Sequence, residues 1–430
     1  MIRAVCALLG IGTVAVAVAA PQVSQGTLRL ADLEAVALER NPTLAQAEAN
    51  VSAARGKARQ AGLYPNPTVG ATADEVSNAP TVRGGKWGFF LQQQIVLGGK
   101  LSKSELVLFQ DATRAEAEAQ AQRLRVLTSV RQLFYRALAA GQTVAIRTQM
   151  IDLLQQAVVT SRQLQNVGQA DQPDILEIEV EQERAGLALT EARNAETQVW
   201  KQLAAVTGNL DLQPVPLDGN IDQLPEIDSA VALEAILRDS PEIMLAQAGV
   251  SRAEAALRLA RAEKIPDLDV RGGLIYNREL VEPSGIPTGL QGFFDVGIQI
   301  PLFNRNQGGV AAAEAELVSA RREVDRINLS LRARFAAAYK DFIDSRDAVE
   351  RYRTSMLPRA QRAYELYLAS FRQMAAAYPQ VLIARRTLFQ LQDEYSERLA
   401  KAWSKAVEIQ GLLLSGGLDM PGKADSVGRQ

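Results

Sequence analysis

In the second half of the chain, apolar or small residues recur at alternating spacings of three and four. The spacing has one additional step of four, from Leu331 to Phe335. This pattern is a heptad seam with a single stutter, which is typical of helices that pack laterally in a coiled coil. It predicts one helix over 306–371, about 97 Å long at 1.5 Å per residue. The seam residues are Val310, Ala313, Leu317, Ala320, Val324, Ile327, Leu331, Phe335, Ala338, Phe342, Ser345, Val349, Tyr352 and Met356.

Three further segments have helical character. Residues 103–166 carry a less regular seam and predict a second long helix. The segments 43–62 and 173–207 together have about 55 residues, so stacked end to end they would nearly match that helix in length. A rod of this length has no globular core, and we therefore expect lateral packing between helices.

Between the helical segments, apolar and polar residues alternate with a period of two, which predicts two β-hairpins over about 68–97 and 268–302. Each strand has about 9–12 residues, the length of a tilted strand that crosses a bilayer. The hairpin tips, 77–85 and 279–289, are polar and contain Pro and Gly, as exposed loops do. The alternative is two half-buried hairpins of a soluble domain. The apolar positions are Trp87, Phe89, Leu91, Ile95, Leu97, Leu268, Val270, Leu274, Tyr276, Leu290, Phe294, Val296, Ile298, Ile300 and Leu302.

These elements occur twice in the same order, with a period of about 200 residues, which is too long for a solenoid repeat. We therefore divide the chain into a first structural repeat at 20–208, a linker at 209–228, a second structural repeat at 229–414 and a flexible tail at 415–430. The linker is rich in Pro, Asp and Gly. Each repeat ends in a pair of long helices, over about 103–207 and 306–414. The matching motifs are Leu33-Glu34-Ala35 with Leu233-Glu234-Ala235, Gly88-Phe89-Phe90 with Gly292-Phe293-Phe294, and Pro173 with Pro379.

Residues 1–19 have the features of an export signal peptide. Arg3 precedes a long apolar run, and Ala17-Val18-Ala19 fits the small-residue cleavage pattern. An uncleaved membrane anchor is the alternative, although the run is at the lower length limit for spanning a bilayer. Cys6 lies too early in this segment for a lipidation site.

Composition excludes most enzyme classes. The chain has 430 residues, no His and a single Cys, which lies in the leader. The mature protein therefore has no Ser–His or Cys–His nucleophile, no disulfide and no zinc site of the usual ligands. The net charge of −2 argues against a nucleic-acid partner. Gly98-Gly99-Lys100 lacks the other residues of a phosphate-binding loop and is better interpreted as a bend between strand and helix. We expect no enzyme activity, no cofactor and no resident metal.

Four strands cannot close a barrel, and open sheet edges are not tolerated in hydrocarbon. An exported chain with four strands of membrane length must therefore share a barrel among subunits. Two copies give eight strands with a nearly filled interior, and three give twelve, which leaves room for an aqueous pore. The predicted fold is mainly α with a small β part, in which long coiled-coil helices continue a shared barrel.

The order of elements, the duplication and several motifs resemble the TolC-type outer-membrane efflux channel family over about 28–414. The motifs Tyr64-Pro65-Asn66-Pro67, Gly98-Gly99-Lys100 and Pro301-Leu302-Phe303-Asn304-Arg305-Asn306-Gln307-Gly308 are most similar to its cobalt–zinc–cadmium efflux branch. The resemblance implies a homotrimer with a twelve-stranded barrel in outer-membrane lipid and a helical tunnel in the periplasm. It also implies a periplasmic membrane-fusion adaptor, an inner-membrane RND pump and export of heavy-metal cations.

Other functions stay open at this point. A channel of the same family for drug efflux or type I protein secretion is one alternative. A periplasmic coiled-coil adaptor or scaffold is another, although we would expect a single helical hairpin flanked by β-rich segments in such a protein.

The turns between the long helices are candidate docking sites for the adaptor. The second turn is unusually apolar for an exposed segment, and small residues allow another helical hairpin to approach closely. The candidate docking residues are Gly168, Gln169, Ala170, Met374, Ala375 and Ala376.

An acidic stripe after the first turn is a candidate pore gate. Asp174, Glu177 and Glu181 lie along one side of the predicted helix, and the matching position of the second half is Gln380. In a trimer, each carboxylate would form a ring that attracts cations. The alternative is that these residues, with Asp171 as the N-cap, only stabilise the start of the helix.

Overall fold

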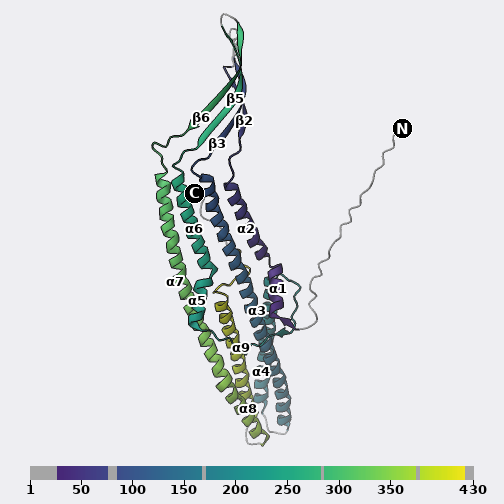
Figure 1. Cartoon of the computed structure of the whole chain (residues 1–430). Helices are drawn as coiled ribbons and strands as arrows, with labels where there is room; N and C mark the ends of the chain where they lie inside the picture. The colour runs from purple at the N-terminus through teal and green to yellow at the C-terminus, as the bar shows by residue number, and fades with distance from the viewer. Residues whose placement is uncertain (1–26, 76–84, 167–170, 282–284, 374–377, 422–430) are drawn as a thin grey trace, which may run out of the picture.

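The computed structural model describes residues 27–75, 85–166, 171–281, 285–373 and 378–421. The chain is an elongated rod, with a four-stranded sheet at one end and long helices along the remainder (Figure 1). This arrangement is the mainly helical fold with a small sheet that the sequence predicts. No helix in the described part of the chain is both long and apolar enough to span a membrane.

The two repeats contain matching elements. The first repeat comprises β1 (Leu28–Arg29), α1 (Leu30–Arg40), α2 (Pro42–Ala61), β2 (Thr68–Asp74), β3 (Lys86–Ile95), α3 (Lys100–Asn166) and α4 (Gln172–Thr207). After β4 (Leu217–Asp218), the second repeat comprises α5 (Ser229–Asp239), α6 (Pro241–Ala262), β5 (Leu268–Val281), β6 (Ile286–Ile298), α7 (Gln307–Arg351), the π-helical turn η1 (Tyr352–Met356), α8 (Leu357–Arg372) and α9 (Tyr378–Gln410).

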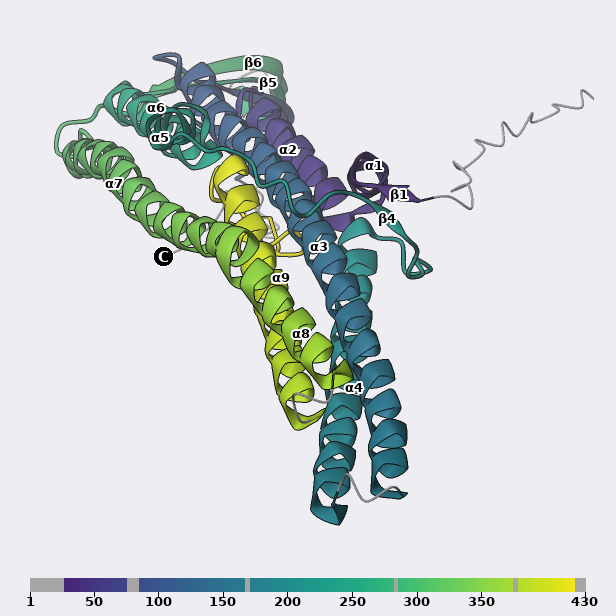
Figure 2. The same ribbon diagram turned by 90° about the horizontal axis from the view of Figure 1, so that it is seen from below.

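Helix α3 is the central element of the rod. Helix α2 lies along the part of α3 nearer the sheet and α4 along the part farther from it, so the two helices accompany α3 in succession (Figure 1). Helices α6 and α9 of the second repeat also pack against α3, and both contact α7. Seen from below, α8 and α9 run beside one another along the same side of α3 (Figure 2). Lateral packing therefore replaces a globular core, as the seam predicts.

The heptad seam of the second repeat follows the buried side of α7. Every seam residue from Val310 to Tyr352 is buried or half-buried, and Met356 is exposed. The predicted continuous helix over 306–371 is not observed, because η1 interrupts it and ends two residues before Pro358. The additional residue of a π turn rotates the following helix, and this rotation moves Met356 out of the seam.

The four long strands form one antiparallel sheet in the order β2–β3–β5–β6. The two predicted hairpins therefore join through β3 and β5, where Trp87 pairs with Tyr276 and Ile95 with Leu268. The second hairpin extends farther than predicted, since its strands reach Val281 and resume at Ile286. Strands β2 and β6 are the two edges, and neither edge is paired within the described chain.

The register gives the sheet two different faces. One face is apolar and exposed, with Phe89 72% and Phe294 70% accessible. Residues opposite one another in the register share a face. The apolar face carries Val69, Trp87, Phe89, Leu91, Ile95, Leu268, Val270, Leu274, Tyr276, Leu290, Phe294, Val296 and Ile298. The other face carries Thr68, Thr72, Asp74, Lys86, Gln92, Gln94, Asp269, Arg271, Asn277, Gln291 and Asp295.

Left-handed backbone conformations mark the bends between sheet and helices. Gly98 and Gly99 have φ values of 72° and 63°, which only glycine adopts readily, and α3 begins directly after them. In the second repeat, Asn306 occupies the N-cap position of α7 with φ 58°. Its side chain does not cap the helix but donates a hydrogen bond to the Ala260 carbonyl oxygen at 2.9 Å.

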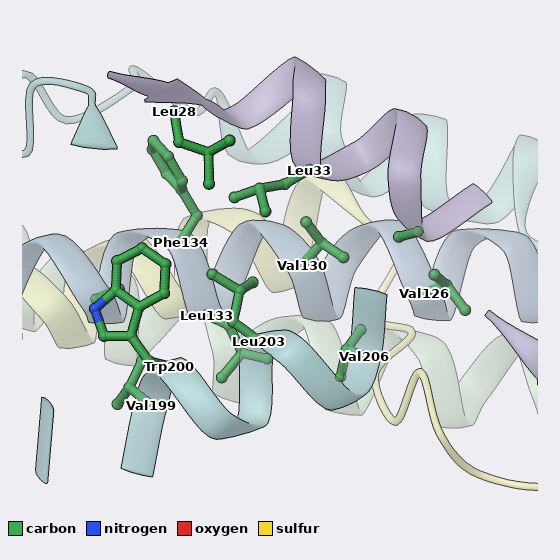
Figure 3. Close-up of a cluster of buried hydrophobic side chains, with 12 residues drawn as sticks. Leu28, Leu33, Val126, Val130, Leu133, Phe134, Val199, Trp200, Leu203 and Val206 are labelled. Atoms are coloured by element: carbon green, nitrogen blue, oxygen red, sulfur yellow. The ribbon is translucent and has the colours of Figure 1, made fainter. Parts of the chain in front are cut away.

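Each repeat has a hydrophobic cluster around one phenylalanine of its long helix. In the first repeat, Phe134 of α3 packs with Leu33 of α1 and Trp200 and Leu203 of α4 (Figure 3). In the second, Phe342 of α7 packs with Ile236 of α5 and Ala406 of α9. Both phenylalanines are fully buried. The duplication therefore extends from the order of elements to their packing.

The linker between the repeats is ordered and contacts both repeats. Its β4 strand pairs in parallel with β1, a contact that the sequence did not predict. The Trp403 indole nitrogen of α9 donates to the Ile221 carbonyl oxygen at 2.6 Å, and the Tyr395 hydroxyl donates to Asp222 at 2.9 Å. The linker therefore ties α9 to the first repeat.

The prediction of a flexible tail is wrong for residues 415–421. The Gly417 amide donates to the Ser129 hydroxyl oxygen at 2.9 Å, and the Gly417 carbonyl oxygen accepts from Gln122 at 3.3 Å. Pro421 is buried. The segment 415–421 is thus packed on α3, and 422–430 lie outside the described residues.

Candidate functional site at the helical end

The acidic stripe lies in the first three turns of α4. The helix has Asp171 at its N-cap position and Pro173 in its first turn, although the Asp171 side chain makes no capping hydrogen bond. Glu177 is exposed and makes no ion pair with a described residue, whereas Glu181 is half-buried. The backbone of Asp174 is in the helix, and its side chain lies outside the described residues.

Glu181 connects the two helix pairs. Its Oε1 lies 2.9 Å from Nη1 of Arg184 on the same helix and 3.6 Å from Nη1 of Arg386 on α9. Two guanidinium groups therefore compensate this carboxylate. Of the stripe residues with described side chains, Glu177 alone keeps an uncompensated charge.

A second ion pair joins α3, α4 and α9 nearer the middle of the rod. Arg147 of α3 lies 3.2 Å from Asp393 of α9, measured from Nε to Oδ2, and donates to the Ala188 carbonyl oxygen of α4 at 2.6 Å. Burial raises the pKa of the Asp393 carboxyl, and the charge and hydrogen bond of Arg147 oppose this rise. Burial has the larger effect on this pKa, so the ionised form of Asp393 needs Arg147 for its stabilisation.

The helical end also has a small apolar core. Leu154, Ala157 and Val158 of α3 pack with Ile178 of α4, and Tyr378 and Leu382 of α9 cover them. Burial raises the pKa of the Tyr378 hydroxyl, while its hydrogen bond with Thr160 opposes this change. The first turn of α9 is thereby attached to the α3–α4 hairpin.

A pocket of about 120 Å³ lies between these three helices. Its walls are mostly apolar, and Glu177, Glu181 and Arg386 supply its charges. Carboxylates that line a cleft with low-dielectric walls concentrate the electrostatic field on passing cations. The pocket therefore combines apolar walls with two carboxylates and one guanidinium group where the three helices meet.

The structure brings Glu177 and Glu181 together but leaves Gln380 exposed in the first turn of α9. The six candidate docking residues, Gly168, Gln169, Ala170, Met374, Ala375 and Ala376, lie outside the described residues. Sequence reasoning missed Arg147 and Arg386 as partners of the carboxylates. The basic pair Arg385-Arg386, which follows the matching positions Gln380 and Ile383, was the available signal. Among the described residues, no group of three or more Asp, Glu, His or Cys side chains could hold a metal ion.

Comparison with known proteins identifies the chain. The profile of the outer membrane efflux protein family matches residues 33–209 and 232–413, one stretch in each repeat. The chain belongs to this family. Membership confirms the resemblance seen in the sequence and places the protein in the outer membrane as an efflux channel.

The chain is also similar to the cobalt-zinc-cadmium resistance protein CzcC of Cupriavidus metallidurans. It is 26% identical over 395 residues, which are 91% of each chain.

Solved structures share the fold. A membrane protein from Pseudomonas aeruginosa superposes with a TM-score of 0.75 at 19% identity, covering 89% of this chain and 93% of the other. CusC, which forms a transmembrane channel, superposes with a TM-score of 0.73 at 19% identity over 90% and 92% of the two chains. The outer membrane protein VceC of Vibrio cholerae gives 0.73 at 18% identity over 90% and 96%.

Proposed function

We propose that the protein is the outer-membrane component of a tripartite efflux system and functions as a homotrimer. Three chains pair their free β2 and β6 edges into a twelve-stranded barrel, with the apolar face of the sheet in lipid and the polar face toward the lumen. The long helices then form a tunnel that extends into the periplasm. The observation that carries this proposal is the division of the sheet into a mainly apolar and a mainly polar face in a member of this family.

The proposed partners are a periplasmic membrane-fusion adaptor and an inner-membrane RND pump. The adaptor would dock at the two turns between the long helices, where Gly168, Gln169, Ala170, Met374, Ala375 and Ala376 are the candidate contacts. The pump would supply the driving force for export.

We propose heavy-metal cations as the cargo. The support is the motif similarity to the cobalt–zinc–cadmium branch and the relationship to a cobalt-zinc-cadmium resistance protein. Deleting the gene should sensitise cells to zinc, cobalt or cadmium. Sensitivity to drugs alone, or loss of a secreted protein, would favour the drug-efflux or type I secretion alternative.

The assembly is tested by extracting the full-length protein from outer membranes with detergent. We expect a complex near three times the 46.6 kDa precursor mass, less the leader, with mainly helical circular dichroism and ion conductance in planar bilayers. A monomeric protein without conductance would contradict the proposal.

We further propose that Asp174, Glu177 and Glu181 belong to the gate. Glu181 would contribute to closure through Arg386, and Glu177 would present its charge to passing cations. Combined Asp174→Asn and Glu177→Gln substitutions should lower the cation preference and weaken block by multivalent cations. The control is Glu179→Gln on the same helix, because Glu179 pairs with Arg162 of α3 at 2.6 Å. Unchanged conductance and selectivity with reduced thermal stability would show that the carboxylates only stabilise the helix.

A further inference from the structure

The polar face of the sheet contains two aromatic residues that break its alternation. Phe90 on β3 and Phe293 on β6 lie on the same face as the charged and amide side chains. Phe90 follows Phe89, and Phe293 precedes Phe294, so each strand carries two consecutive phenylalanines whose side chains lie on opposite faces. The position of these two apolar rings on a polar face requires a structural explanation.

Glycines provide the space for these rings. The register places Gly70, Phe90, Gly273 and Phe293 in one row across the four strands. A Cβ atom on Gly70 would lie 2.4 Å from the Phe90 ring, and one on Gly273 would lie 2.6 Å from the Phe293 ring. The rings therefore lie against the sheet over glycines.

The two rings hold Arg271. Its guanidinium carbon lies 4.0 Å from the centroid of Phe90 and 5.5 Å from that of Phe293. Both distances are within the range of cation–π attraction. The Arg271 Nε is buried without a hydrogen-bond partner among the described residues.

Nearby carboxylates do not neutralise this arginine. Asp295 is opposite Arg271 in the register, and Asp269 is two residues before it on the same face. Neither forms an ion pair with Arg271 in the described structure, whereas Lys86 of the same face pairs with Glu75 at 3.1 Å. The phenylalanines thus keep the guanidinium apart from the carboxylates, at a fixed position on the wall.

We propose that Arg271 is a specificity-determining residue of the channel, held by Phe90 and Phe293 as a fixed positive charge on the lumen wall. This inference rests on the proposed function, because the polar face must line the lumen. In a trimer the charge occurs three times around the barrel. It opposes the passage of cations through the strand region and lowers the cation preference that Asp269 and Asp295 produce there.

The test is the reversal potential of the purified channel in planar bilayers under a KCl gradient. Arg271→Gln should raise the cation-over-anion permeability ratio severalfold, and Arg271→Lys should restore much of the original value because it retains the charge. Phe90→Leu should also alter the ratio, since Arg271 can then approach Asp295.

Lys86→Gln is the matched control, because it removes the same charge from the same face. Lys86 lies six residues before Gln92, the partner of Arg271, on β3. That separation is about 20 Å at 3.3 Å per residue, which exceeds the screening length of about 8 Å at physiological salt. We expect a smaller change. An unchanged ratio for Arg271→Gln in a conducting trimer, or an equal change for Lys86→Gln, would overturn the inference and leave the channel function intact. Absence of conductance from the wild-type protein would instead refute the channel itself.

Discussion

The long helices of the two repeats differ although they occupy matching positions. Helix α3 is one α-helix of 67 residues, whereas its counterpart consists of α7, the π turn η1 and α8. Pro358 explains the interruption, because proline lacks the amide donor and its ring collides with the carbonyl of residue i−4, here Thr354. The π turn relieves this conflict, and the Leu357 amide bonds to the Tyr352 carbonyl oxygen, five residues back.

The interruption changes how each helix is buried. Beyond its midpoint α3 still buries Leu154, Ala157, Val158 and Ser161 between its neighbours, while no described residue of α8 is buried. Helix α8 packs mainly on α9, and α3 packs on both α4 and α9. Two sequence-related helices thus have different roles: α3 is the axis of the rod, and α8 is its most weakly packed long segment. Segments with few buried apolar contacts are those that open first.

The largest expected effect tests whether the two repeats are equally important for stability. Phe134→Ala and Phe342→Ala should each lower the free energy of unfolding by about 3–5 kcal/mol, because each empties the centre of a cluster. Denaturant titration followed by circular dichroism in detergent measures both. Phe109→Ala is the control, since Phe109 of α3 is 56% exposed. A large loss in only one repeat would show that the duplicated clusters are not equivalent.

A proline placed in α3 should reproduce the interruption of the second repeat. Met150 follows Phe134 at the same separation as Pro358 follows Phe342. Met150→Pro should cost about 3 kcal/mol relative to Met150→Ala, because α3 is enclosed and cannot rotate freely. The reverse change, Pro358→Ala, should slow amide hydrogen exchange over 352–358. Unaltered exchange there would mean that packing against α9, and not the proline, maintains η1.

The C-terminal segment provides a test of intermediate expected effect, since its Gly417 hydrogen-bonds to Ser129 and Gln122 of α3. Gln122→Leu should cost about 1–3 kcal/mol, because the Thr43 hydroxyl and the Gly417 carbonyl lose a buried partner. In a chain that ends at Ser415 the same substitution should cost less, as Gly417 is then absent. Equal costs in both chains would show that Gln122 acts independently of this segment.

The smallest effect concerns the pH dependence of the contact between α3 and α9. The pKa of Asp393 is raised by burial, so folded protein binds the proton more tightly than unfolded protein. Stability therefore falls as pH increases from the usual Asp pKa through the raised value. Asp393→Asn should flatten this part of the profile, and Arg147→Gln should extend it to higher pH. Thermal melts between pH 4 and pH 8 provide the measurement, and identical slopes for all three proteins would contradict the assignment.

Local patterns in the sequence predicted much of this architecture. The seam from Val310 to Tyr352, the four strands and the bend at Gly98-Gly99 follow from side-chain periodicity and backbone conformation, which act over a few residues. The π turn was missed because the heptad seam continues to Met356 in the sequence. In the structure, the effect of Pro358 on the preceding turn is stronger than the preference of the seam for a continuous helix. At the site, the stripe of Glu177 and Glu181 was visible from spacing, but its compensation by Arg386 was not, since the two residues are far apart in the chain.

The sequence by itself determined the elements, their duplication and the two faces of each strand, because each depends on neighbours along the chain. Only the tertiary structure decided that β3 pairs with β5 to unite the repeats, that the linker pairs with β1, and that 415–421 returns to α3. It also decided that Phe90 and Phe293 meet around Arg271. These contacts join segments up to hundreds of residues apart, and their partners are selected by register and packing, which no local pattern specifies.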